Sequence, residues 1–242
     1  MTDETSVRPG AIRSGDEVRR MFGRITRRYD LMNRLMTGGR DQAWRRQAAR
    51  LAAPAPEERV LDLATGTADL ALAFLGETAA EAVIGVDFVE PMLRRARAKL
   101  DRLDERRVRL VAADALALPF SDGAFGCVAS AFLLRNLADL RRGLAEMRRV
   151  TAPGGRVVAL EITQPTVPVW RELFRLYFHH LVPALGALVS GDRAAYTYLP
   201  RSVERFVTPA ELARLMLDVG LWDVRVTRLG LGTVTVHVGR VP

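Results

Sequence analysis

The stretch best suited to hold a ligand is an apolar run that ends in small residues and is followed by a helical pattern. Residues 60–69 read Val-Leu-Asp-Leu-Ala-Thr-Gly-Thr-Ala-Asp, which predicts a buried strand, a tight turn and the start of a helix. The turn holds Gly66 and Thr67, and its small side chains let a ligand approach the backbone closely. The free N–H groups at the start of the helix attract negative charge. Asp62, just before the turn, is placed to meet an ammonium group.

The number of glycines in this run excludes two common nucleotide-binding loops. A dinucleotide fingerprint requires the spacing G-x-G-x-x-G, whereas residues 64–69 contain a single glycine. A phosphate-binding loop requires Gly-Lys followed by serine or threonine, and no such run follows. The run resembles the first motif of class I S-adenosylmethionine-dependent methyltransferases, whose ligand carries a carboxylate, an ammonium group and a ribose. The alternative is an ordinary strand-to-helix turn, in which Asp69 only favours the first helical turn.

Acidic residues also follow the next two predicted strands. Residues 82–87 predict a second strand that ends at Asp87, where an acid in α/β nucleotide sites accepts hydrogen bonds from ribose hydroxyls. Residues 108–112 predict a third strand, and Asp114 and Ala115 follow it at the position that meets an adenine edge in this fold. The sequence therefore places several candidate ligand contacts at strand ends.

Arg135 and Asn136 follow the predicted fourth strand, residues 125–131. Arginine stays protonated, so Arg135 can stabilise an anion but is a poor base. A fifth strand is predicted at residues 156–161, and helices alternate with all five strands, which indicates a parallel, doubly wound sheet. Ligands bind such sheets beyond the carboxyl ends of the strands. The residues at or just past these ends are Asp62, Gly66, Asp87, Asp114 and Arg135.

Additional segments flank the predicted sheet core. Two helices, at residues 16–36 and 40–53, precede the first strand and are expected either to pack on the domain or to cover the ligand mouth. Residues 162–207 are too long for a simple connection and are expected to form helices over the site, broken at Pro183, Gly186 and Ser190-Gly191-Asp192. Their aromatic stripe either packs on the core or lines a channel for an apolar substrate.

The predicted architecture is an α/β fold with a mostly parallel sheet of seven strands. The last two strands are expected at residues 222–228 and 233–238, after a helix that Thr208 caps. Residues 1–15 are expected to be a disordered tail, and residues 16–242 to form a single domain.

Composition narrows the class of protein further. The chain has 242 residues, 49% of them apolar, which is enough for one large core. Its single cysteine and the lack of a ligand cluster exclude a disulfide framework and predict no metal site. No unbroken run of eighteen apolar residues appears, so no membrane-spanning helix is expected, and the default compartment is the cytoplasm. The net charge of +8 favours an anionic membrane surface or nucleic acid only weakly.

Runs typical of one family occur before, within and after the predicted sheet, and those before and after it are the family-specific ones. The runs are Met21-Phe22, Arg28-Tyr29-Asp30, Asn33-Arg34-Leu35-Met36, Trp44-Arg45, Asp114-Ala115, Leu118-Pro119-Phe120, Leu134-Arg135-Asn136, Leu188-Val189-Ser190-Gly191-Asp192, Tyr196-Thr197-Tyr198-Leu199-Pro200 and His237-Val238-Gly239-Arg240. With these runs, residues 18–240 resemble the ubiquinone/menaquinone biosynthesis C-methyltransferases. The run Thr67-Ala68-Asp69 leans towards the demethylmenaquinone branch.

The resemblance implies methylation of a ring carbon on a prenylated quinol, with S-adenosylmethionine as cofactor. It implies that four residues bind that cofactor, namely Thr67, Asp87, Asp114 and Ala115. Two positions depart from the family pattern. Ala131 stands where the family often has a cofactor-binding serine, so that contact is not carried over, and Leu133 stands where the family has a glycine.

The chemistry of ring methylation suggests roles for three further residues. A ring carbon becomes a good nucleophile when a neighbouring hydroxyl loses its proton, and Arg135 is expected to stabilise the resulting phenolate. Asn136 is expected to fix the ring or Arg135, and Tyr196 to line the quinol pocket or hydrogen-bond the quinol. His180 is an alternative base, although a histidine on an apolar helix is more often a packing residue.

Other functions remain open at this point. The core motifs also allow methylation of oxygen or nitrogen in another small molecule. Base-methylating enzymes of similar fold usually carry an Asn/Asp-Pro-Pro-aromatic run after the fourth strand, and residues 131–134, Ala-Phe-Leu-Leu, lack it. Nucleic acid is therefore not an expected partner. A prenylated substrate implies transient contact with the membrane surface, peripheral on its inner face, and a homodimer is left open.

Overall fold

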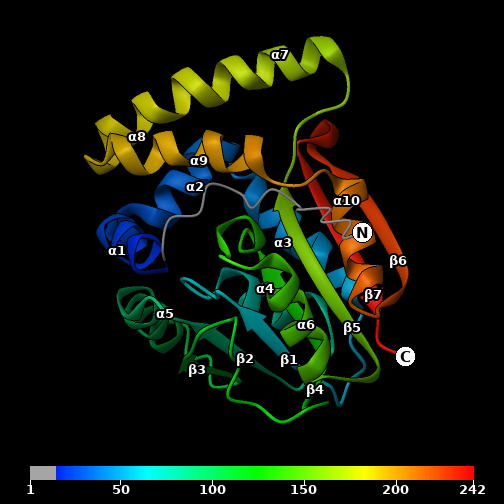
Figure 1. Cartoon of the computed structure of the whole chain (residues 1–242). Helices are drawn as coiled ribbons and strands as arrows, with labels where there is room; N and C mark the ends of the chain where they lie inside the picture. Colours follow the sequence, from blue (N-terminus) through cyan, green and yellow to red (C-terminus); the bar gives the residue numbers. More distant parts are fainter. Residues whose placement is uncertain (1–14) are drawn as a thin grey trace.

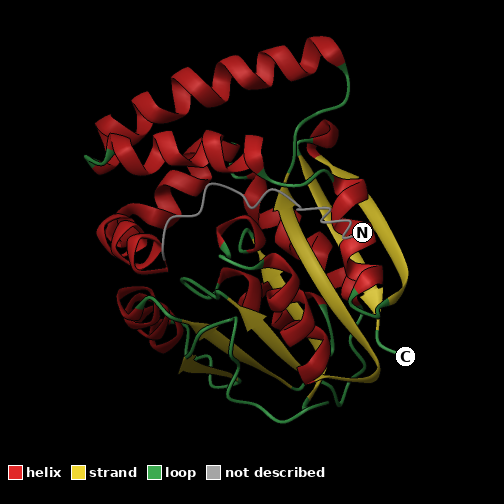
Figure 2. Ribbon diagram, viewed as in Figure 1, coloured by secondary structure: helices red, strands yellow, loops and turns green. Residues whose placement is uncertain are grey.

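The structure, a computed structural model, describes residues 15–242 and is built around a seven-stranded sheet (Figures 1 and 2). The strand order is β3-β2-β1-β4-β5-β7-β6, and β7 alone in this sheet runs antiparallel to its neighbours. The strands are β1 (Arg59–Leu63), β2 (Ala82–Asp87), β3 (Val108–Ala112), β4 (Phe125–Ala131), β5 (Thr151–Ile162), β6 (Trp222–Leu229) and β7 (Val234–Arg240). The predicted doubly wound, mostly parallel sheet is confirmed.

Alternate side chains of each strand point to opposite faces of the sheet, and both faces are buried because helices pack on each of them. In β5, Val158 packs with α3 (Arg40–Ala52) and α4 (Asp69–Glu77), whereas Val157 packs with α6 (Leu140–Val150) and α10 (Pro209–Asp218). Helix α5 (Glu90–Arg102) joins α3 and α4 on the first face. This double cover explains why the strands read as nearly continuous apolar runs.

Several element boundaries differ from the prediction. β5 begins at Thr151, earlier than the predicted Arg156. The sequence predicts a helix at residues 137–150, but α6 begins at Leu140, because the Asp139 carboxylate caps it by accepting the N–H of Arg142 at 2.9 Å. The predicted cap of α10 is present, with the side chains of Thr208 and Glu211 forming a capping box.

The predicted helix at residues 16–36 is two helices. α1 (Gly15–Ile25) and α2 (Tyr29–Thr37) are separated by a 3₁₀ turn that begins at Thr26. The Thr26 hydroxyl donates to the Phe22 carbonyl at 2.8 Å, a local bond that bends helices. Gly15 belongs to α1 and not to the predicted tail, and the rest of that tail lies outside the described residues.

The insertion contains one long composite helix rather than a broken one. α7 (Pro168–Leu176) continues through a π-helical segment (Tyr177–Leu181) into α8 (Val182–Ser190), so the predicted breaks at Pro183 and Gly186 are wrong. The wider π turn, in which the Val182 N–H reaches the Tyr177 carbonyl, accommodates the proline ring that would otherwise clash one turn back. Gly191, in the left-handed conformation, then ends the helix.

This composite helix also corrects an expectation about membranes. Although no unbroken apolar run of eighteen residues occurs, the 23-residue helix Pro168–Ser190 is long and apolar enough to cross a membrane, judged by length and composition alone. Its most apolar window is only 22% buried inside the protein. Its inner side nevertheless packs on the domain, where Phe178 and Val182 join an apolar cluster with Met21 and Met32 of the N-terminal helices.

Helices α1 and α2 and the insertion (residues 162–207) together cover the carboxyl ends of the strands and are here called the roof (Figure 1). The last helix of the roof, α9 (Arg193–Arg205), is capped by Asp192, which accepts the N–H of Ala195 at 3.0 Å. Asp192 also pairs with Arg24 of α1 at 2.8 Å, which ties the insertion to the N-terminal helices.

Candidate functional site

The turn between β1 and α4 is held in an unusual backbone conformation. Ala64, Gly66 and Ala68 all have φ between 52° and 68°, the left-handed region that glycine adopts freely and alanine only at a cost. Such clustered strain is typical of ligand-binding turns. The turn is stabilised from the next strand, because the Gly66 N–H donates to Asp87 Oδ2 at 2.9 Å.

Asp87 lies at the end of β2, as predicted, and is buried. Its second oxygen, Oδ1, accepts the N–H of Val89 at 2.8 Å, so both oxygens hold backbone amides of the surrounding loops. Burial raises the pKa of Asp87 above its usual range, while these amides oppose the rise. Each oxygen keeps a lone pair for another donor, as a ribose hydroxyl would require.

The strand ends surround a first cavity, here called the turn cavity, of about 850 Å³ including its open mouth. Four of the predicted cofactor residues line this cavity, namely Gly66, Asp87, Asp114 and Ala115. Asp114 is exposed and accepts the Leu116 N–H at 2.9 Å, which shapes the loop after β3.

Asp62 is buried inside β1 rather than at the cavity surface. Its Oδ2 accepts from the Thr65 hydroxyl at 2.7 Å and from the Ala71 N–H at 3.1 Å, which fixes the turn to α4. Its Oδ1 has no hydrogen-bond partner among residues 15–242, and burial raises the pKa of Asp62 to about 7. A buried carboxylate oxygen without a donor fits an ammonium group on a ligand.

This raised pKa predicts pH-dependent ligand affinity. A ligand ammonium at Asp62 favours the carboxylate, so binding releases a proton below pH 7 and affinity should rise with pH up to about 7. Above about pH 8 the ligand's own ammonium group loses its proton, so the affinity should fall again. We expect S-adenosylmethionine to bind about fivefold more tightly at pH 7 than at pH 6 by calorimetry. Asp62→Asn should remove this dependence, and an equal pH dependence in the variant would contradict the assignment.

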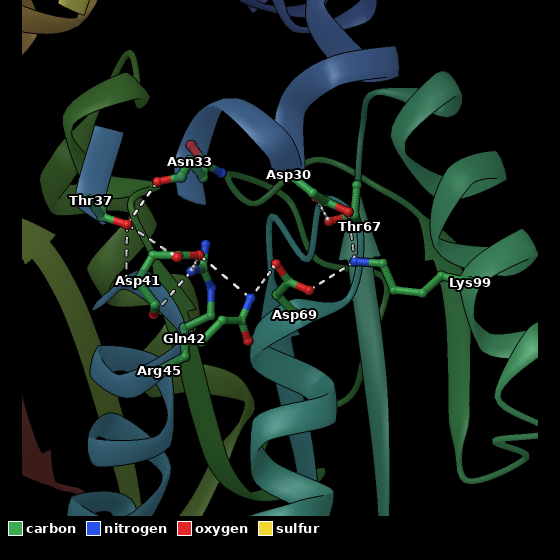
Figure 3. Close-up of polar contacts among 9 residues, drawn as sticks. All are labelled: Asp30, Asn33, Thr37, Asp41, Gln42, Arg45, Thr67, Asp69 and Lys99. Atoms are coloured by element: carbon green, nitrogen blue, oxygen red, sulfur yellow. Dashed lines mark hydrogen bonds and ion pairs between the residues drawn. The ribbon is translucent and has the colours of Figure 1, made fainter. Parts of the chain in front are cut away.

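Thr67 is buried and faces the N-terminal helices. Its hydroxyl donates to Asp30 Oδ1 at 2.6 Å, and it does not line the turn cavity. Lys99 of α5, the chain's single lysine, pairs with Asp30 at 2.9 Å and with Asp69 at 2.8 Å (Figure 3). Gln42 of α3 donates to Asp69 at 2.9 Å. The network ties four helices to the ligand-binding turn, and the predicted cofactor contact of Thr67 stays a prediction.

A second cavity, here called the aromatic cavity, lies under the roof and encloses about 890 Å³ including its mouth. Its walls come mainly from apolar and aromatic side chains of α1, α2 and the insertion. They include Met21, Ile25, Met36, Trp44, Ile162, Phe174, Tyr177, Phe178, Tyr196, Tyr198 and Leu199. The aromatic stripe of the insertion therefore lines a cavity as well as packing on the domain.

Three aromatic residues separate the two cavities, because Phe22, Tyr29 and Phe132 line both. Phe132 has φ 63°, and its carbonyl accepts from Arg135 Nη1 at 2.7 Å and from Asn136 Nδ2 at 3.1 Å. Leu133, where the resembling family has glycine, has φ −90° and needs no glycine. The strained residue of this loop is thus Phe132, which is held by its two polar neighbours.

Arg135 lines the aromatic cavity and is buried. Its Nη1 donates to Glu161 Oε2 at 3.0 Å, and Glu161 Oε1 accepts the Leu134 N–H at 2.6 Å. Burial raises the pKa of the fully buried Glu161, and the nearby Arg135 cation opposes the rise. Arg135 Nε has no hydrogen-bond partner among residues 15–242. A buried cation with an unused donor is suited to bind an oxygen anion.

The other predicted catalytic residues lie nearby. Burial raises the pKa of Tyr196 to about 12, so its hydroxyl stays protonated at neutral pH and can act as a donor in the aromatic cavity. Asn136 lines the turn cavity, and its Oδ1 accepts a hydrogen bond from the Tyr198 hydroxyl at 3.0 Å. This bond joins the loop after β4 to helix α9. His180 is exposed and lines neither cavity. None of these roles is decided by position alone, and they stay predictions.

Several site residues were not singled out by the sequence. Glu161 ends a predicted strand, and this position past an apolar run was the available signal. Asn33 Nδ2 is buried in the wall of the aromatic cavity without a partner among residues 15–242. Asp41 also lines this cavity, and pairs with Arg45 at 2.7 Å and with Thr37 at 3.2 Å (Figure 3). No local pattern marks these helical polar residues as cavity-lining.

Solved structures share this architecture. A methyltransferase from Thermotoga maritima, described as a possible histamine N-methyltransferase, superposes with a TM-score of 0.64 over 91% of this chain and 98% of its own, at 18% identity. The apo form of the S-adenosylmethionine-dependent methyltransferase SibL gives a TM-score of 0.59 over 76% of this chain and 50% of its own, at 25% identity. These likenesses agree with the class I methyltransferase fold.

Sequence relatives cover almost the whole chain. It is 47% identical to demethylmenaquinone methyltransferase of Thermus thermophilus, over 92% of this chain and 100% of the relative. It is 44% identical to the enzyme of that name from Deinococcus radiodurans, over 93% and 92%. A ubiquinone/menaquinone biosynthesis C-methyltransferase UbiE from a Geobacter species is 40% identical over 93% and 96%. Residues 11–241 match the ubiE/COQ5 methyltransferase family. The chain therefore belongs to the ubiE/COQ5 methyltransferase family and is an S-adenosylmethionine-dependent methyltransferase.

Proposed function

We propose that this enzyme transfers a methyl group from S-adenosylmethionine to a ring carbon of demethylmenaquinol, a prenylated quinol, and so forms menaquinol. The names of the relatives support a quinone-precursor substrate. The observation that carries the proposal is the pairing of two cavities across Phe22, Tyr29 and Phe132. One cavity has acids and a glycine-containing turn for a polar cofactor, and the other has aromatic walls for a polyprenyl quinol.

The residues of the turn cavity fit the cofactor's chemical groups. Asp87 and Asp114 line this cavity and offer carboxylates to hydroxyl and amino groups. Asp62 is buried in β1 rather than in the cavity wall, and its unpartnered oxygen is the acceptor that we assign to the ammonium group. Gly66 leaves the backbone open to close approach at the start of α4. When bound, S-adenosylmethionine supplies an electrophilic methyl group attached to a sulfonium. The protein supplies the orientation of both partners.

On the aromatic side, the chain's task is to make a ring carbon nucleophilic. When a ring hydroxyl gives its proton to water, electron density moves onto the neighbouring carbons, and the resulting oxygen anion needs stabilisation. After methyl transfer, the attacked carbon gives up its hydrogen as a proton, which restores the aromatic ring. The Nε–H of Arg135 and the Tyr196 hydroxyl are donors available for that anion. Glu161 holds the guanidinium from its other side, which fixes the direction of Arg135.

The substrate also sets where the enzyme works. A polyprenyl tail is insoluble in water, so we infer that the enzyme visits the inner surface of the cytoplasmic membrane while it otherwise resides in the cytoplasm. The exposed apolar residues of the insertion support such contact. A homodimer stays a prediction.

The proposal is tested with labelled S-adenosylmethionine and a panel of acceptors, namely demethylmenaquinol, a demethylated benzoquinol, a catechol and an aromatic amine. We expect label in a product of the naphthoquinol, with mass fragmentation placing the methyl group on ring carbon. Label on oxygen or nitrogen, or transfer only to the catechol or the amine, would reject the proposal. Preference for the benzoquinol would move the substrate to the ubiquinone branch.

A further inference from the structure

The outer side of the composite helix carries a row of exposed apolar side chains, here called the outer stripe. Its members are Val169, Leu173, Leu176, Leu181 and Leu188, which are 50–82% exposed. Isolated surface leucines are common, but an apolar row along one helix is typical of an interaction surface. The helix forms the upper edge of the molecule in Figure 1, away from the sheet.

The π-helical segment keeps this row continuous. Val169, Leu173 and Leu176 follow the i, i+4, i+7 spacing of one helix face, and Leu181 and Leu188 are seven residues apart on one face of the next stretch. In an unbroken α-helix, each residue turns by about 100°, so Leu181 would lie far from the line of the first three. The wider turn at Tyr177–Leu181 absorbs one residue and returns Leu181 to that line. Such π turns often occur at functional sites.

The opposite side of the same helix forms the wall of the aromatic cavity. Phe174, Tyr177 and Phe178 line that cavity, and the Tyr177 hydroxyl donates to the Met36 carbonyl of α2 at 2.7 Å. One helix therefore separates the proposed quinol pocket from the outer stripe. Because Phe178 and other inner residues are packed on the domain, the helix lies along the surface of the protein rather than standing free of it.

The charge of α7 and of the whole chain favours an anionic partner. Arg171 and Arg175 of α7 are exposed, and Glu172, the acidic residue on the composite helix, pairs with Arg175 at 2.9 Å. Helix α2, which packs against α8, also exposes Leu31 and Leu35 on its own surface. The chain as a whole carries +8, so two copies would repel one another, whereas an anionic surface would attract each of them.

We propose that the outer stripe is the membrane-docking surface of this enzyme and that its partner is an anionic lipid bilayer. This inference rests on the proposed function, because it places the quinol pocket directly beneath the docked helix. The helix lies in the interface with its apolar row in the acyl region. The tail of a quinol then leaves the bilayer beside the helix that walls its pocket.

Sedimentation of the full chain with vesicles tests the proposal. The vesicles are phosphatidylcholine alone, or phosphatidylcholine with about 30% phosphatidylglycerol. We expect binding to the anionic vesicles, reduced at least about tenfold in L173E/L176E, because two apolar anchors are lost and two charges enter the acyl boundary.

The matched control is L217E, which places the same charge on a half-exposed leucine of α10, a helix that packs on β6 and β7. It should bind vesicles like the wild type. L188E tests the far end of the stripe at the most exposed of its leucines and guards against a folding defect in the double variant. Circular dichroism and melting curves accompany each variant.

Three outcomes would overturn the proposal. The first is that the wild type does not bind anionic vesicles, and the second is that L173E/L176E binds as tightly as L217E. The third is a lipid-free dimer, seen by analytical ultracentrifugation, that L173E/L176E dissociates, because a second copy would then cover the stripe.

The failure of the docking proposal can be told apart from the failure of the proposed function. With a naphthoquinol that lacks the long tail, L173E/L176E should retain the wild-type kcat, since neither leucine lines a cavity. Transfer to no quinol at all would reject the function and leave the vesicle result to stand by itself. Normal methylation without vesicle binding would reject the docking surface alone.

Discussion

Replacing Arg135 by lysine is expected to lower kcat for quinol methylation by about 100-fold or more and to leave the Kd for S-adenosylmethionine unchanged. Lysine preserves a cation for Glu161, which Arg135 Nη1 contacts at 3.0 Å. It loses the guanidinium Nε–H, which has no partner among residues 15–242 and is therefore available to the substrate oxygen. Steady-state kinetics with the quinol and calorimetry with the cofactor measure the two effects. Unchanged methylation would remove Arg135 from the mechanism.

Two companion variants separate chemistry from stability. Arg135→Ala should also lower turnover by two orders of magnitude or more, but it leaves a fully buried Glu161 without its cation, at a cost of about 3–5 kcal/mol in unfolding free energy. Its kinetics must therefore be read beside a melting curve. Glu161→Gln keeps an acceptor for the Leu134 N–H and should lower kcat by about tenfold, because Arg135 is then less firmly directed.

Removing the carboxylate of Asp87 is expected to weaken S-adenosylmethionine binding by about 100-fold or more. In Asp87→Ala, the N–H groups of Gly66 and Val89 lose their acceptors at 2.9 and 2.8 Å, and the cofactor loses a charged acceptor for its ribose hydroxyls. Hydrogen bonds to charged groups contribute about 1.5–3 kcal/mol each. Calorimetry of the folded variant measures the loss directly.

The matched control for this variant is Glu90→Gln, three positions further on. Glu90 is exposed and pairs with Arg94 at 2.6 Å on the surface of α5, so its loss should leave the affinity within about twofold of the wild type. At saturating cofactor, Asp87→Ala should recover most of its kcat, because Asp87 lines the turn cavity and not the aromatic cavity. Equal affinity in Asp87→Ala and the wild type would contradict the ribose assignment.

The sheet was predictable because its information is local. Each strand is a short run of apolar residues between turn residues, and β2, β3 and β4 begin and end where the sequence predicts. The acid after β2 also required no knowledge of the fold beyond strand order, since parallel strands present their carboxyl ends on one edge. The predicted start of α6 was wrong because the apolar spacing of a helix does not show which polar side chain caps it, and here the cap is Asp139.

The sequence alone determined the class of fold, the turn at Gly66, and the acids and the arginine at the strand ends, because alternating burial and glycine geometry act over a few neighbouring residues. Only the tertiary structure decided which partners these groups have. Thr67 meets Asp30 and Arg135 meets Glu161 across 37 and 26 residues, and such pairs depend on how helices pack. Packing likewise carried the helix through Pro183, since the inner face of the insertion is buried against the N-terminal helices while its outer face remains exposed.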